Sequence, residues 1–156
     1  ALNTSNTSTW STTNYTNNSF SSLTNVIAYR TDILGLLSQD VITKDLTNNN
    51  LVRVVDVVRF YFKDPLLTAQ SDTVTFTLIG AHFKAGTGTI NSSQRNKMAA
   101  AIIDYIENDA VDGNIMLMGD YNMYGSSESA YQTLIAGSES YLVLCEPRCQ
   151  QKSIHL

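Results

Sequence analysis

The chain has few cysteines, no long apolar run and no excess of basic residues. Its 156 residues include two cysteines and two prolines, and no apolar run approaches the length of a membrane-spanning helix. Ten lysines and arginines face fourteen aspartates and glutamates, so the formal net charge is −4. Nucleic-acid binders usually carry a basic patch. Any phosphate-bearing ligand must therefore be held by individual arginines or by a metal cation.

The composition is that of a single globular domain with an exposed start. Hydrophobic residues make up 43% of the chain and charged residues 15%, which excludes a disordered polyelectrolyte. The first 22 residues are dominated by Asn, Thr and Ser, as in the exposed surface of a secreted protein, and no signal peptide is visible. Three aromatic residues within this stretch favour an ordered loop over a free tail.

A strand, a helix and a second strand form the centre of the sequence. Thr73–Ala81 is rich in β-branched and apolar residues and is typical of a buried strand. Ser92 or Ser93 can cap a following helix, whose apolar residues recur at helical spacing up to Ile106. The short apolar run Ile115–Met118 then suits an interior strand. This order predicts a βαβ unit with parallel strands and a right-handed crossover.

Three polar residues follow these two strands directly. His82 comes after the first strand, and Asp120 and Asn122 come after the second. Parallel strands have their carboxyl ends at the same edge of a sheet, where ligands of open α/β sheets bind. We therefore expect the imidazole, the carboxylate and the carboxamide to converge. The alternative is a histidine with a local hydrogen bond beside an unrelated turn.

The preceding segments predict antiparallel strands. Leu51–Phe62 reads as a long strand that ends at Lys63-Asp-Pro65, and Thr73–Ala81 then returns antiparallel to it. Two shorter apolar runs, Val26–Arg30 and Ile33–Leu37, are separated by two polar residues and predict a hairpin.

Several of these residues carry a family resemblance. The motif His-Phe-Lys-Ala-Gly starts at His82, Gln94-Arg95 opens the helix, and Gly-Asp-Tyr-Asn ends at Asn122. Together they resemble the endonuclease/exonuclease/phosphatase superfamily, which includes deoxyribonuclease-I-like nucleases, sphingomyelinase-like enzymes and inositol-phosphate phosphatases. The stretch from Gly125 to Tyr131 is most similar to secreted bacterial members. The resemblance covers roughly Leu2 to Ser140.

The resemblance implies a fold class and a division of the chain. We expect an α/β (α+β) fold, a partial four-layer α/β/β/α sandwich with mixed sheets, over residues 1–140. Residues 141–156 form an atypical tail, although Tyr141–Leu144 reads as one more strand. The spacing of Cys145 and Cys149 allows a small disulfide in an oxidising compartment, and an unrelated tail fits equally well. His155 lies too near the end to carry a role.

The resemblance also implies a divalent-metal-dependent phosphoester hydrolase. In it, Asp120 orients or deprotonates a water molecule and is a candidate metal ligand, and Asn122 holds a phosphate oxygen. His82 stabilises charge or supplies a proton near the leaving group, for which its neutral pKa is suited. Arg53 contacts phosphate, because a guanidinium matches two phosphate oxygens at once. The cofactor is expected to be Mg²⁺ or another cation such as Mn²⁺ or Ca²⁺.

Two other arginines compete for a role at the site. Arg59 lies on the same face of its strand as Arg53 by alternation. Arg95, at the start of the helix, is expected to brace a loop or pair with an acid rather than touch substrate. A solvated surface arginine is the alternative for Arg53 and Arg59 alike.

The chain departs from the family at both ends. The family's metal-binding glutamate precedes the first residue, and its closing Ser-Asp-His motif is absent from Gln150–Leu156. We therefore expect the middle of a larger fold, with an open sheet face covered by the rest of a longer chain or by a second copy. Two functions stay open: a phosphoester hydrolase complete only in a parent protein, with nucleic acid among its substrates, and a catalytically silent binding or assembly module.

Overall fold

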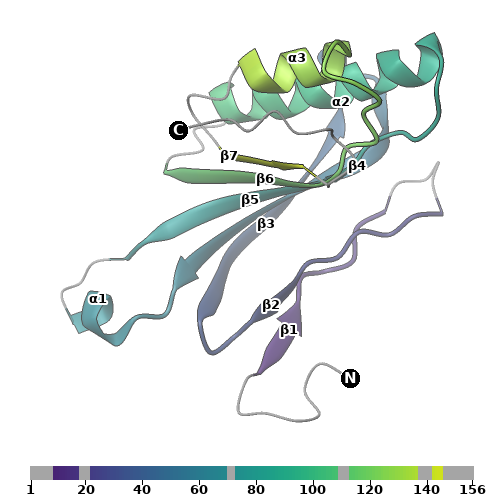
Figure 1. The fold of residues 1–156 in the computed structure, drawn as a ribbon. Coiled ribbons are helices and arrows are strands. Elements are labelled where there is room, and N and C mark those ends of the chain that lie inside the picture. Colours follow the sequence, from purple (N-terminus) through teal and green to yellow (C-terminus); the bar gives the residue numbers. More distant parts are fainter. Residues whose placement is uncertain (1–8, 18–21, 70–72, 109–112, 137–141, 146–156) are drawn as a thin grey trace.

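The structure is a computed structural model that describes residues 9–17, 22–69, 73–108, 113–136 and the backbone of 142–145. A five-stranded mixed sheet lies between a helical layer and a short two-stranded sheet (Figure 1). The five strands follow one another across the sheet in chain order: β3 (Leu34–Lys44), β4 (Asn50–Phe62), β5 (Thr75–His82), β6 (Asn114–Asp120) and β7 (Leu142–Cys145). This mixed arrangement with two sheets confirms the predicted fold class.

The predicted βαβ unit is present. β4 and β5 are antiparallel, and β5 and β6 are parallel, joined by the helix α2 (Thr89–Asn108). The helix begins at Thr89, before the predicted serine caps, because the Ser92 amide already donates to the Gly88 carbonyl at 3.0 Å. Strand β7 pairs in parallel with β6, so the strand predicted at Tyr141–Leu144 is present, at Leu142–Cys145.

The predicted hairpin between Val26–Arg30 and Ile33–Leu37 is wrong. β2 (Ala28–Arg30) pairs instead with β1 (Trp10–Thr12), while the second run opens the eleven-residue strand β3, which pairs with β4. The thirteen-residue β4 offers ladder groups along its whole length, and a long partner satisfies more of them than a short hairpin arm could. Ile27 and Tyr29 of the first run pack against the face of the sheet rather than along its edge.

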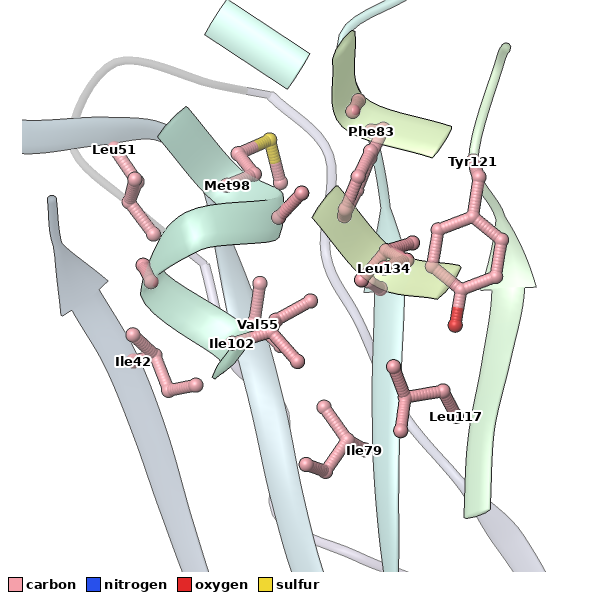
Figure 2. Packing of buried hydrophobic residues seen from close by; sticks show 14 of the residues in the cluster. Ile42, Leu51, Val55, Ile79, Phe83, Met98, Ile102, Leu117, Tyr121 and Leu134 are labelled. Atoms are coloured by element: carbon pink, nitrogen blue, oxygen red, sulfur yellow. The ribbon is translucent and has the colours of Figure 1, made fainter. Parts of the chain in front are cut away.

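The larger core lies between the sheet and the helices. α2 and the shorter α3 (Ser129–Ala136) cover this face, and Figure 2 shows Val55 and Ile102 meeting between strand and helix. Alternation places Ile79 in this core and its neighbour Leu78 on the other face. Burying a side chain of this size stabilises the fold by about 1.5–3 kcal/mol.

The opposite face carries the smaller sheet and a smaller cluster. Ile27 and Tyr29 pack there against Val58 and Phe60, and the rings of Tyr29 and Phe60 lie 5.0 Å apart. The one-turn helix α1 (Pro65–Ala69) follows the end of β4. Cys149 and His155 lie outside the described residues, so the two alternatives for the tail, a small disulfide and an unrelated sequence, both stay open.

In the described part of the chain, no helix has both the length and the apolar character needed to cross a bilayer.

Candidate functional site

His82 and Asp120 meet at the ends of β5 and β6. They are the last residues of these strands and are direct register partners in the parallel ladder. The His82 Nε2 atom lies 3.7 Å from the Asp120 Oδ2 atom, and both side chains are about two-fifths exposed, at 39% and 41%. The Phe83 amide donates to the Asp120 carbonyl at 2.8 Å, which continues the pairing one step further. The expected convergence of these two side chains is therefore confirmed.

A glycine allows the two strands to approach this closely. Gly119 has a φ of +137°, and a Cβ atom placed on it would lie 1.9 Å from the Ala81 carbonyl oxygen. No side chain larger than hydrogen fits this position without a shift of backbone. The glycine of the Gly-Asp-Tyr-Asn motif is thus a steric requirement of the strand end that presents Asp120.

Asn122 completes a tight turn that fixes one oxygen of Asp120. Its backbone amide donates to the Asp120 Oδ1 atom at 2.9 Å, and its φ of 46° is a left-handed value that asparagine tolerates. Its Nδ2 atom donates to the Phe83 carbonyl at 3.0 Å. The Asn122 carboxamide keeps one N–H and its oxygen for other partners.

Arg53 reaches the same place from β4. Its Nη1 atom donates to the carbonyls of His82, at 3.2 Å, and of Phe83, at 2.5 Å. Burial lowers the pKa of the Arg53 guanidinium, and the nearby Asp120 charge raises it. The guanidinium remains charged at any ordinary pH. The structure thus brings Arg53 to the other three predicted residues, and its Nη1 atom is engaged by backbone.

The competing arginine lies elsewhere. Arg59 is exposed and pairs in register with Thr77, five residues before His82 along β5. At about 3.3 Å per residue, this separation is roughly 16 Å. Arg59 therefore lies outside the strand-end site, by which we mean His82, Asp120, Asn122 and Arg53.

Sequence reasoning missed the role of Phe83. Its carbonyl accepts hydrogen bonds from both Arg53 and Asn122, so one oxygen connects β4, β5 and the segment after β6. The Phe83 ring is fully buried and meets the Tyr121 ring edge-on, with centroids 4.9 Å apart (Figure 2). No sequence signal marks a backbone carbonyl. The burial of a phenylalanine directly after the strand was the available hint.

The strand-end site contains four polar side chains of different chemistry. It combines one permanent cation, one carboxylate and one imidazole, with a carboxamide beside them. Among the residues that the structure describes, no three His, Cys, Asp or Glu side chains gather in a way that would hold a metal ion. Such a set suits the binding of an anion and the transfer of a proton.

Comparisons with known proteins address the fold. No protein-family model and no curated protein sequence matches the chain. Among solved structures, the human Nocturnin catalytic domain with bound sulfate anion matches at a TM-score of 0.57 and 12% identity, over 83% of this chain and 48% of that one. D. rerio TDP2 complexed with single-strand DNA product matches at 0.47 and 14%, over 79% of this chain and 45% of that one.

The Nocturnin match concerns the architecture of the chain. The chain spans about half the length of both solved structures, at 48% and 45%. The likeness to Nocturnin shows an α/β sandwich, which is consistent with the fold that the superfamily resemblance implies. At 12% identity, it shows the fold alone.

Proposed function

We propose that the chain carries the phosphate-handling part of a phosphoester hydrolase of the nuclease, phosphodiesterase or phosphatase type. The observation that carries the proposal is the pairing of His82 with Asp120 across the ends of two parallel strands, with Nε2 and Oδ2 3.7 Å apart. Arg53 and Asn122 stand around the same Phe83 carbonyl, so all four side chains converge on one exposed edge.

Each side chain has a role in hydrolysis that suits its chemistry. The Asp120 Oδ2 atom, which faces His82, orients or deprotonates the attacking water, because the Asn122 amide already fixes the Oδ1 atom. His82 stabilises charge or supplies a proton near the leaving oxygen. The remaining donors of Arg53 and Asn122 contact the phosphate oxygens.

A divalent cation belongs to the proposal as a second requirement. Mg²⁺ is commonly held by one or two carboxylates together with substrate phosphates and water. Asp120 is the carboxylate of the strand-end site and would supply the first of these ligands. Mg²⁺, or Mn²⁺ or Ca²⁺ in its place, would neutralise phosphate charge there. Water and the phosphate oxygens of the substrate would supply the other ligands.

The substrate class follows from the charge of the chain. The net charge of −4 argues against a broad basic surface, so a phosphate ester would be recognised locally, at Arg53. Nucleic acid is one such ester, and a lipid headgroup or sugar phosphate is another. The Asn-, Ser- and Thr-rich first 22 residues support an extracellular location as part of the same proposal.

Hydrolysis of bis(4-nitrophenyl) phosphate tests the proposal. We expect turnover with Mg²⁺ that EDTA abolishes, and a fall of about 10²–10⁴-fold in Asp120→Ala and in His82→Ala. The control is Glu107→Ala, which removes an exposed carboxylate at the far end of α2 and should leave the rate unchanged. Equal rates of hydrolysis in the parent chain and in Asp120→Ala would refute the proposal that the chain is a hydrolase.

A second candidate is a silent binding module. The observation that favours it is the absence, among the described residues, of a three-ligand metal cluster. Such a module would bind phosphate at Arg53 and Asn122 without turnover. Calorimetric titration with inorganic phosphate separates the two: heat of binding that Arg53→Ala removes, together with no hydrolysis, would favour the module.

A further inference from the structure

Two segments leave the strand-end site, and one buried side chain lies between them. Residues 83–88 follow β5, and residues 121–128 follow β6. Arg95 projects from the first turns of α2 and is only 1% exposed, although it carries a permanent charge. Burying such a charge is costly unless it is paired and hydrogen-bonded, so its partners define what the residue holds.

The partners of Arg95 come from both segments. Its Nη1 atom donates to the carbonyls of Lys84, at 2.8 Å, and of Gly86, at 2.9 Å. Its Nε atom forms a buried ion pair with Glu128, the residue directly before α3. Bracing a loop and pairing with an acid were the two alternatives expected for Arg95, and both are present.

Tyr124 closes these contacts into a ring. Its backbone amide donates to the second oxygen of Glu128 at 3.1 Å, and its hydroxyl accepts from the Gly86 amide at 3.1 Å. Its aromatic ring lies over the Arg95 guanidinium, 5.2 Å from centroid to Cζ. The segment after β5 and the segment after β6 are therefore fastened to each other and to the same cation.

The attachment points lie close in sequence to the proposed reacting groups. Lys84 is two residues beyond His82, and Tyr124 is two residues beyond Asn122. A displacement of either segment would be transmitted through this short length of backbone to the Phe83 carbonyl, which Asn122 holds at 3.0 Å. Misplacement of a reacting group by about 1 Å can cost 10²-fold in rate.

We propose that Arg95 and Glu128 are positioning residues for the strand-end site, fixing the segments after β5 and β6 so that His82 and Asn122 keep their relative places. The catalytic part of this inference rests on the proposed hydrolase. The geometric part stands without it, because the ring of contacts exists whatever the site does.

The test needs variants that keep the fold. Removing one partner of a buried ion pair leaves an uncompensated charge, whereas replacing both partners by apolar residues of similar volume is often tolerated. We therefore choose the double variant Arg95→Met with Glu128→Leu, and the milder Glu128→Gln, which keeps the size and one acceptor oxygen. The control is Lys97→Gln. Lys97 lies on the same helix as Arg95, and the substitution removes its ion pair with Asp45, in which the charged atoms are 3.0 Å apart.

Two readouts are measured on the full chain of each variant. Two-dimensional NMR follows the Phe83 backbone amide and the Asn122 side-chain amide, which report the local geometry without any activity. Steady-state hydrolysis of bis(4-nitrophenyl) phosphate gives kcat and KM separately. Thermal unfolding confirms that each variant is folded, and Glu128→Gln decides the outcome if the double variant does not fold.

A positioning role predicts a specific combination. Both NMR signals should move in the Arg95 and Glu128 variants, and kcat should fall by about 10–100-fold with KM changed less than about threefold. Lys97→Gln should change neither readout. Unmoved signals, a changed KM with unchanged kcat, or moved signals with unchanged kcat in an active chain would each overturn the proposal. If the parent chain is inactive, the proposed hydrolase fails, and the NMR signals alone decide the positioning.

Discussion

The two faces of the central sheet are built for different purposes. On the helical face, β3 to β6, α2 and α3 contribute to one large buried cluster. On the face covered by β1 and β2, the buried cluster of the described residues consists of Val58, Phe60 and Leu78. By alternation, His82 belongs to this thinner face, together with Leu78. One face thus supplies stability, which leaves the other free to expose polar groups at its edge.

The largest effect is expected at Gly119, where β6 approaches the backbone of β5 closely. Gly119→Ala should cost about 3 kcal/mol or more, because the residue has positive φ and its new Cβ would overlap the Ala81 carbonyl. Urea denaturation measures the loss. Gly125→Ala is the matched control, since no atom lies within 4 Å of its added carbon, and an unchanged midpoint is expected there. Equal costs at the two positions would contradict the steric argument.

The neighbours Ile79 and Leu78 compare the two faces directly. Ile79 is fully buried on the helical face, and Leu78 is 8% exposed on the other. Within the 2–5 kcal/mol range for such truncations, we expect about 4 kcal/mol for Ile79→Ala and about 2 kcal/mol for Leu78→Ala. Chemical denaturation at equilibrium checks both values, and the reverse order would show that the thinner face carries the stability.

Comparing substitutions of the two arginines of β4 tests whether the effect is confined to the strand-end site. If the chain is the proposed hydrolase, Arg53→Ala should lower kcat/KM for a phosphodiester about tenfold, equal to about 1.4 kcal/mol, because it removes the cation of the proposed phosphate position and two hydrogen bonds to backbone. Arg59→Ala, on the same strand but exposed and distant, should match the parent chain. A comparable loss in both variants would assign the effect to net charge.

The smallest effect concerns a buried acid on the thinner face. Asp56 is 3% exposed and accepts from the Thr16 hydroxyl at 2.5 Å. Burial raises the pKa of its carboxyl, and hydrogen bonds from Thr16 and Asn25 lower it. Because the net change is upward, the stability from this group is full below the unfolded pKa and is lost as pH rises through the folded one.

An uncharged replacement should remove this loss. The unfolding free energy of Asp56→Asn, relative to the parent chain, should rise by on the order of 1 kcal/mol between about pH 4 and about pH 8. Denaturation at several pH values measures it. The exposed Asp104→Asn serves as the control and should follow the parent chain more closely. A difference that does not vary with pH would sink this account of Asp56.

The βαβ unit was predictable because its signals are local. An apolar strand, helical spacing after Ser92 and a second apolar run placed His82 and Asp120 at one edge, and the register pairing bears this out. The association of β1 with β2 was not predictable, because Ile27 and Tyr29 could pair at an edge or pack on a face with the same composition. In the structure β3 pairs with the long strand β4, and β2 pairs with β1.

The finer geometry of the site depends on backbone, which a sequence does not display. The Arg53 Nη1 atom donates to two carbonyls because of the register of β4 with β5, in which Val55 pairs with Ala81. The same holds for the contact between Gly119 and Ala81. The residue types identify the side chains of the site, and the register of the strands determines which hydrogen bonds their atoms form.

The shared carbonyl of Phe83 has a consequence for how this edge opens. Since Arg53 and Asn122 both donate to one oxygen, neither β4 nor the segment after β6 can detach from β5 without releasing the same acceptor. Amide hydrogens around it should therefore exchange with solvent at a common rate, as one cooperative unit, instead of fraying strand by strand.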